Sequence, residues 1–121
     1  MIKQKLMRVL LADDNPALHS ALALLLEARL NARVIGEAYN MEDLLTNLKL
    51  LHPDLVILDW DLPGIPKTGQ VTALQKLYPG LKVVIIGSQP EVAQLASEAH
   101  ADAYVCRCDP PEQMVQVLQA L

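Results

Sequence analysis

The chain has 121 residues, 52% of them hydrophobic, and its 10 Lys+Arg against 14 Asp+Glu give a formal net charge of −4. This length and apolar content predict a single folded domain over residues 1–121 and argue against disorder. The cations are scattered, which disfavours direct nucleic-acid binding, and no apolar run reaches the roughly 18–20 residues of a membrane helix. Two cysteines, one residue apart, cannot link distant segments, so we expect a protein of the reducing cytoplasm.

Short apolar runs alternate with amphipathic stretches along the chain. Five short runs are predicted to be strands, and they cover residues 7–12, 33–38, 55–59, 83–87 and 103–106. Apolar residues at a spacing of three to four predict helices over 16–30, 41–51, 70–77, 91–99 and from 111 to the C-terminus. Asp14 or Asn15 is a plausible cap of the first helix, and Asn40 is the expected cap of the second. A turn-rich loop containing Pro63, Gly64, Pro66 and Gly69 precedes the third helix.

Repeated strand–helix units in a chain of this length predict a parallel sheet with helices on both faces. We therefore expect a three-layer α/β sandwich with a five-stranded sheet. If the sheet has the flavodoxin-like order 2-1-3-4-5, its first and third strands are neighbours. The fully apolar runs 55–58 and 83–86 indicate strands covered on both faces, and they should lie in the middle of the sheet.

Acidic side chains follow two strands that this order makes neighbours. Asp13 and Asp14 end the first strand, and Asp59 and Asp61 end the third. Ligands of open α/β sheets bind beyond the carboxyl ends of the strands, where these four groups would gather. Crowded carboxylates raise one another's pKa or require a cation, and an oxygen-only set suits Mg²⁺. Helix capping is the plainer alternative for Asp13 and Asp14.

Other phosphate-binding motifs are missing from the sequence. Neither a G-x-G-x-x-G turn follows the first strand nor does a G-x-x-x-x-G-K-[ST] loop occur anywhere. His19, His52 and His100 are expected to be packed or solvated rather than catalytic. Arg107 is the one cation expected at the carboxyl end of a strand, where it can meet an anionic ligand.

Three segments together resemble the receiver domain of two-component response regulators: LLADDNP at 10–16, PDLVILDWDLPG at 53–64 and ADAYVCR at 101–107. The resemblance implies that Asp59 accepts a phosphoryl group from a sensor histidine kinase. It also implies that Asp14, Asp59 and the backbone carbonyl of Asp61 ligate Mg²⁺, with Asp13 assisting through water. A receiver is a phosphoacceptor of bacterial signal transduction rather than an enzyme, beyond its own phosphorylation and dephosphorylation. It acts through an output domain or downstream protein, often in transcription regulation, and some receivers form homodimers.

Two residues depart from the family's pattern on the side that reads the phosphoryl group. Gly87 stands where the family has Ser or Thr, and the hydroxyl of Ser88 comes one residue late. Arg107 replaces the family's lysine, and Tyr104 stands at the position of its switch aromatic. These departures favour an alternative: a pseudo-receiver that serves as an interaction or dimerisation module with weak or no phosphorylation switch. His100 replaces a usual glycine, which can strain its turn.

Two further patterns have weaker readings. Asp59-Trp60-Asp61 resembles the D-x-D of haloacid-dehalogenase-type phosphatases, but those carry it on the first strand and in longer chains, and Pro63 occupies the place of their usual Thr or Val. Cys106 and Cys108 form a C-x-C pair without a second Cys or His pair. We expect them to be small thiols rather than a metal or redox site.

Overall fold

The computed structural model describes residues 6–63 and 69–121, so Gly64 and Pro66 of the expected loop lie outside the described residues. Five parallel strands form one sheet in the order β2-β1-β3-β4-β5. Their bounds are β1 Met7–Ala12, β2 Ala32–Ala38, β3 Leu55–Asp59, β4 Lys82–Gly87 and β5 Ala103–Cys106. The predicted strands, their order and the central position of the two fully apolar runs are confirmed.

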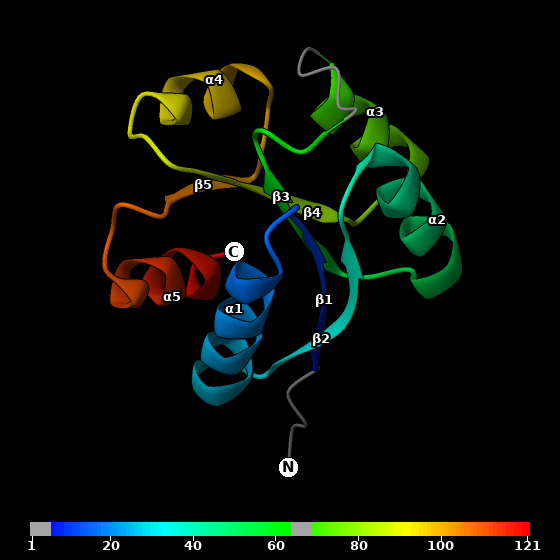
Figure 1. Cartoon of the computed structure of the whole chain (residues 1–121). Helices are drawn as coiled ribbons and strands as arrows, with labels where there is room; N and C mark the ends of the chain where they lie inside the picture. The colour runs from blue at the N-terminus through cyan, green and yellow to red at the C-terminus, as the bar shows by residue number, and fades with distance from the viewer. Residues whose placement is uncertain (1–5, 64–68) are drawn as a thin grey trace.

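Helices cover both faces of the sheet, as predicted (Figure 1). They are α1 Pro16–Arg29, α2 Met41–Leu51, α3 Gln70–Leu77, α4 Val92–Glu98 and α5 Pro111–Gln119. The side chain of Asn15 caps α1 by accepting from the N–H groups of Ala17 and Leu18, so Asn15 rather than Asp14 is the cap. Asn40 caps α2 through the N–H of Asp43, as the sequence predicts.

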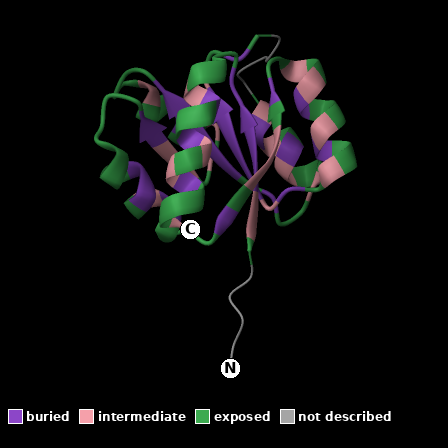
Figure 2. Cartoon of the chain, turned by 60° about the horizontal axis from the view of Figure 1, so that its bottom comes forward, coloured by how far each residue is buried: buried purple, intermediate pink, exposed green. Residues whose placement is uncertain are grey.

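Alternation along the strands divides the core into two layers, because successive strand side chains point to opposite faces. Val9 and Leu11 of β1 pack in the layer that α1 and α5 close, whereas Leu10 and Ala12 pack in the layer under α2, α3 and α4. Figure 2 shows the result as a buried sheet between helices whose outer faces are exposed. With both faces filled by apolar side chains, the sheet leaves only its strand ends for polar chemistry.

One of the three histidines is buried in the fold, and the other two lie at the ends of elements. His19 is 1% exposed, and its ring stacks on Tyr39 with the ring centroids 5.0 Å apart. His52, at the carboxyl end of α2, and His100, before β5, adopt φ values of 48° and 65°. That left-handed region favours glycine, so the strain expected at His100 is present.

Our expectation for the cysteines was wrong, because Cys106 and Cys108 form a disulfide with their Cα atoms 5.0 Å apart. Cys106 is buried at the end of β5, and Cys108 is exposed. A metal or redox site was the less favoured reading of this C-x-C pair. The disulfide closes a three-residue loop that has Arg107 at its centre. Among the described residues, no helix is long and apolar enough to cross a membrane.

Candidate functional site

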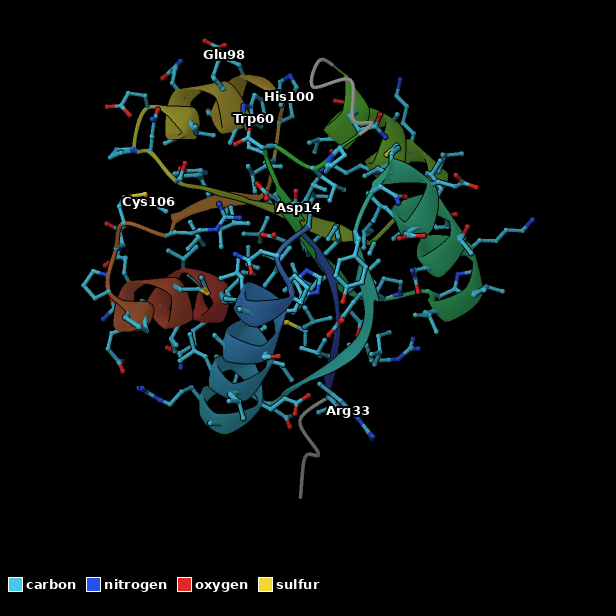
Figure 3. All side chains as sticks on the ribbon, in the orientation of Figure 1. Asp14, Arg33, Trp60, Glu98, His100 and Cys106 are labelled. Carbon is cyan, nitrogen blue, oxygen red and sulfur yellow. A yellow bond between two sulfur atoms is a disulfide. The ribbon has the colours of Figure 1, made fainter. Side chains whose placement is uncertain are left out.

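The acidic residues of β1 and β3 meet at the carboxyl end of the sheet. Ala12 is paired with Leu58, so the next residues, Asp13 and Asp59, come side by side. Asp13 is 2% exposed and Asp59 4% exposed, while Asp14 is exposed to solvent. One carboxylate oxygen from each of these three residues lies within 4.8 Å of the other two. Figure 3 shows Asp14 at this end of the sheet, opposite Arg33. The predicted meeting of the two acidic sites is confirmed for Asp13, Asp14 and Asp59, whereas the carboxylate of Asp61 is not part of this set.

Each buried carboxylate is held by the backbone of its own turn. Asp13 Oδ1 accepts a hydrogen bond of 2.8 Å from the N–H of Asn15, and Asp59 Oδ1 accepts one of 3.0 Å from the N–H of Asp61. An aspartate that accepts from the N–H two residues later forms an Asx turn, which fixes the side chain. Both turns therefore hold one carboxylate oxygen in place and leave the other, Oδ2, for the pocket.

Arg107 supplies positive charge to the pocket from the end of β5. Its Nη2 lies 2.5 Å from Asp13 Oδ2 and 3.0 Å from Asp59 Oδ2, and its side chain is 28% exposed. The backbone N–H of Arg107 donates to the carbonyl of Gly87 at 2.8 Å, which anchors the residue to β4. This pair of contacts connects the ends of β1, β3 and β5. Hydrogen bonds between ionised partners are stronger than those between neutral ones, so the connection is a firm one.

The charges in the pocket shift one another's pKa values. Burial raises the pKa of Asp13, and the charge of Asp59 raises it further, although the Asn15 N–H and Arg107 act in the opposite direction. Burial opposes the charge of Arg107, but Asp59 and Asp13 outweigh burial and raise its pKa. Two buried carboxylates, an exposed third and one guanidinium leave the pocket negative. This donor set fits a hard divalent cation, because Mg²⁺ takes carboxylate oxygens and water.

Tyr104 occupies the space beside Gly87. A Cβ atom built on Gly87 would lie 2.7 Å from Tyr104 Oη and 3.2 Å from Val92 Cγ1. Tyr104 Oη donates to the backbone carbonyl of Gln89 at 2.5 Å, and burial raises the pKa of its hydroxyl. Ser88 is exposed just beyond β4, and its hydroxyl has no hydrogen bond within the described part of the chain. Within the described part of the chain, Ser88 therefore takes no part in the contacts that join Asp13, Asp59 and Arg107.

The structure brings together Asp13, Asp14, Asp59 and Arg107 but leaves Ser88 apart. Asp61 contributes its N–H to the Asp59 turn, and its carbonyl as a metal ligand stays a prediction. The sequence reasoning missed the N–H of Asn15 and the carbonyl of Gln89. An aspartate at a strand end followed by a turn is a signal for the first of these contacts. Because any residue supplies a backbone carbonyl, no sequence signal marks the second.

Comparisons with known proteins agree with this geometry. A family model described as "Response regulator receiver domain" matches residues 9–119. The chain is 30% identical over 115 residues to the transcriptional activator protein ExaE of Pseudomonas putida, covering 93% of this chain and 54% of that protein. It is 28% identical to the nitrate/nitrite response regulator protein NarL of Escherichia coli, covering 98% of this chain and 56% of that protein. The chain thus spans about half the length of these relatives.

Solved structures show the same fold. The crystal structure of a LuxR-family two-component response regulator from Aurantimonas sp. SI85-9A1 superposes with a TM-score of 0.84 at 25% identity, covering 96% of this chain and 84% of that one. The isolated REC domain of RcsB from Salmonella enterica serovar Typhimurium, with phosphomimetic BeF3⁻, gives a TM-score of 0.82 at 22% identity, covering 96% and 88%. With its acidic pocket, its strand order and the match over residues 9–119, this chain belongs to the response regulator receiver domain family, whose members are signalling phosphoacceptors rather than enzymes.

Proposed function

We propose that Asp59 accepts a phosphoryl group from the phosphohistidine of a sensor kinase, with Mg²⁺ bound in the acidic pocket. The observation that carries this proposal is the set of three carboxylates, Asp13, Asp14 and Asp59, with ligand atoms within 4.8 Å of one another. Asp59 is the central member, because it ends β3, between β1 and β4, and its carboxylate is held by the Asp61 N–H.

The transfer needs positioning and charge neutralisation more than covalent help from the protein. An oxygen of Asp59 attacks the phosphorus, the phosphorus–nitrogen bond breaks, and the departing imidazole nitrogen takes up a proton. The Asx turn orients the Asp59 carboxylate for an in-line approach. Arg107, which already contacts Asp59, can hold a phosphoryl oxygen in its planar fork.

The residues that would hold Mg²⁺ are Asp14, Asp59 and the carbonyl of Asp61, with Asp13 acting through water. Bound there, Mg²⁺ would neutralise charge between the attacking carboxylate and the phosphoryl oxygens. Asp14 is exposed and Asp13 is buried beside it, so one ligand faces solvent and the other faces the pocket.

We also propose that the domain works in the cytoplasm as part of a regulatory pathway. A sensor histidine kinase supplies the phosphoryl group, and an output domain or a downstream protein responds, in transcription regulation as for the relatives of similar sequence. Support comes from the share of those relatives that the chain spans, about half of ExaE and of NarL. A homodimer of receiver domains is a further way to transmit the signal.

Incubation with Mg²⁺ and a small acyl phosphate tests the central proposal. We expect intact-mass spectrometry to detect one added phosphoryl group that hydroxylamine removes, as for an acyl phosphate. Asp59→Asn should abolish the addition, and omission of Mg²⁺ should reduce it strongly. Asp109→Asn, at an exposed aspartate outside the triad, is the matched control and should be phosphorylated like the wild type. Labelling that survives Asp59→Asn would exclude Asp59 as the acceptor.

A second candidate function is a pseudo-receiver that binds a partner or a second copy with little response to phosphorylation. The contact that favours it is Tyr104 against Gly87, since no hydroxyl there can draw the aromatic ring inward. Beryllofluoride, a phosphoryl mimic, separates the two readings. If it shifts the NMR signals of Tyr104 or changes the oligomeric state, the domain switches; if it binds and neither changes, the pseudo-receiver reading holds.

A further inference from the structure

We propose that Arg107 is a built-in cation that competes with the divalent metal, so that metal gains Asp59 and Asp13 only when the guanidinium leaves them. This inference rests on the metal site proposed above and adds a regulating residue to it. The observation that carries it is that a single nitrogen, Arg107 Nη2, contacts both buried carboxylates, at 2.5 Å and 3.0 Å.

All four oxygens of the two buried carboxylates are engaged by the protein itself. On Asp13, Oδ1 accepts from the Asn15 N–H and Oδ2 from Arg107. On Asp59, Oδ1 accepts from the Asp61 N–H and Oδ2 contacts Arg107. The two amide contacts belong to tight turns and are part of the backbone, whereas the two Arg107 contacts come from a side chain. A ligand that needs a carboxylate oxygen therefore displaces Arg107 most easily.

Displacement of Arg107 must occur by side-chain rotation. Its backbone N–H is bonded to the Gly87 carbonyl at 2.8 Å, and the disulfide between Cys106 and Cys108 flanks it on both sides. The Arg107 side chain, in contrast, is 28% exposed, so it has a route to solvent. Because one nitrogen serves both carboxylates, one rotation frees both Oδ2 atoms together.

Asp14 offers an arriving cation its first contact. It is exposed and makes no hydrogen bond or ion pair with another of the described residues, yet it has an oxygen within 4.8 Å of oxygens on Asp13 and Asp59. A divalent cation bound at Asp14 repels the guanidinium and attracts the same oxygens. Metal binding and release of Arg107 are thus the two sides of one equilibrium.

The test is a titration of the full chain with Mg²⁺, followed by calorimetry and by the fluorescence of Trp60, the one tryptophan of the sequence. Trp60 directly follows Asp59 and is partly buried, at the same end of the molecule as Asp14 (Figure 3). Arg107→Gln should bind Mg²⁺ at least about tenfold more tightly than the wild type, because the metal no longer has to displace a charge-assisted contact. Arg107→Lys keeps the charge on a compact head group, so its Mg²⁺ affinity should lie between those of the wild type and Arg107→Gln.

Arg33→Gln is the control, because Arg33 is exposed at the opposite end of the sheet and its loss changes the net charge equally (Figure 3). Its Mg²⁺ affinity should equal that of the wild type. Urea unfolding gives a second readout: Arg107→Gln should be less stable than wild type without Mg²⁺, and saturating Mg²⁺ should remove most of the difference. This linkage follows because a ligand of the folded state stabilises it.

Equal or weaker Mg²⁺ affinity in Arg107→Gln would overturn the inference, as would lack of Mg²⁺ binding in every variant. If Arg107→Gln does not fold, unchanged affinity in Arg107→Lys overturns it instead. The proposed function fails separately. A protein that shows the competition but takes no phosphoryl group on Asp59 keeps the inference and loses the function. A protein phosphorylated on Asp59 whose variants bind Mg²⁺ alike does the reverse.

Discussion

On the β1 and β3 side of the pocket, Asp13, Asp14 and Asp59 stand where the receiver pattern has its carboxylates. On the β4 and β5 side, Gly87 and Arg107 replace a hydroxyl residue and a lysine. The first side meets a strict chemical demand, because a phosphoryl group and a hard cation both need oxygen ligands at fixed places. In the proposed function the second side transmits the result, which contacts of another kind can do. On that proposal, acceptance of a phosphoryl group and its readout belong to different residues of one pocket.

The two sides of the pocket also differ in how their side chains are held in position. Asp13 and Asp59 are each fixed by the N–H two residues later in the chain, so their positions depend on local turns. Tyr104 instead depends on the missing side chain of Gly87 and on the Gln89 carbonyl, a contact that residues on both sides can alter. The β4 and β5 side of the pocket, called the reading side below, is therefore the easier one to change by substitution.

The largest expected effect comes from Gly87→Thr. The new side chain would start 2.7 Å from Tyr104 Oη, so the ring must move and give up its bond to Gln89. Overpacking of this kind destabilises by about 1–3 kcal/mol. Urea unfolding measures the loss, and NMR shifts of Tyr104 report the new position of the ring.

A double-mutant cycle checks the cause of that loss. In a Tyr104→Ala background the obstructing ring is gone, and Gly87→Thr should then reduce stability much less. An equal loss in both backgrounds would show that Tyr104 is not what Gly87 accommodates.

A smaller effect is expected from reducing the disulfide. Closing a three-residue loop stabilises the fold by roughly 1–2 kcal/mol through the entropy of the unfolded chain. Without reductant, a thiol reagent should find no free thiol in the denatured protein, and after reduction it should titrate both Cys106 and Cys108. Cys108→Ser should match the reduced wild type in stability. Free thiols in the protein before reduction would contradict the pairing.

The smallest effect concerns the acidic side and its pH dependence. Burial raises the pKa of Asp13, so folding favours its neutral form. The ionised form of Asp13 therefore destabilises the folded state. In Mg²⁺-free buffer Asp13→Asn should therefore be more stable than wild type at neutral pH. The advantage should shrink as the pH falls through the raised pKa of Asp13 and vanish below the unfolded value.

Asp14→Asn is the matched control for this measurement, because Asp14 is a solvent-exposed neighbour in the same turn. Because Asp14 carries no burial penalty on its carboxylate, Asp14→Asn should not show the gain in stability expected of Asp13→Asn at neutral pH. If the stability advantage of Asp13→Asn over the wild type grows as the pH falls, folding does not raise the pKa of Asp13.

Most of the fold could be predicted from the sequence because the apolar pattern is strong. The predicted bounds of β1, α2 and β3 match the structure, and the start of β2 differs by one residue. The acidic side of the site could be predicted too, since strand order alone brings Asp13 beside Asp59. These features depend on hydrophobic periodicity and topology, both of which the order of residues contains.

The reading side could be predicted only in part. Gly87 and Arg107 were identified as departures, but the reach of Arg107 to both carboxylates depends on side-chain geometry. The Cys106–Cys108 disulfide was missed, because spacing does not tell a bonded C-x-C pair from two thiols. The cap choice between Asp14 and Asn15 also needed the backbone geometry of the turn, which gives Asn15 an extended conformation.

The span between Asp13 and Arg107 has a consequence for how the protein is made. The two residues are 94 positions apart, so the guanidinium is among the last parts of the domain to leave the ribosome. Until then Arg107 cannot contact the carboxylates of Asp13 and Asp59, and closing the sheet around them is less favourable. Long-range pairing of this kind comes late in folding. Closure of the acidic pocket thus marks a chain that has been synthesised and folded through β5.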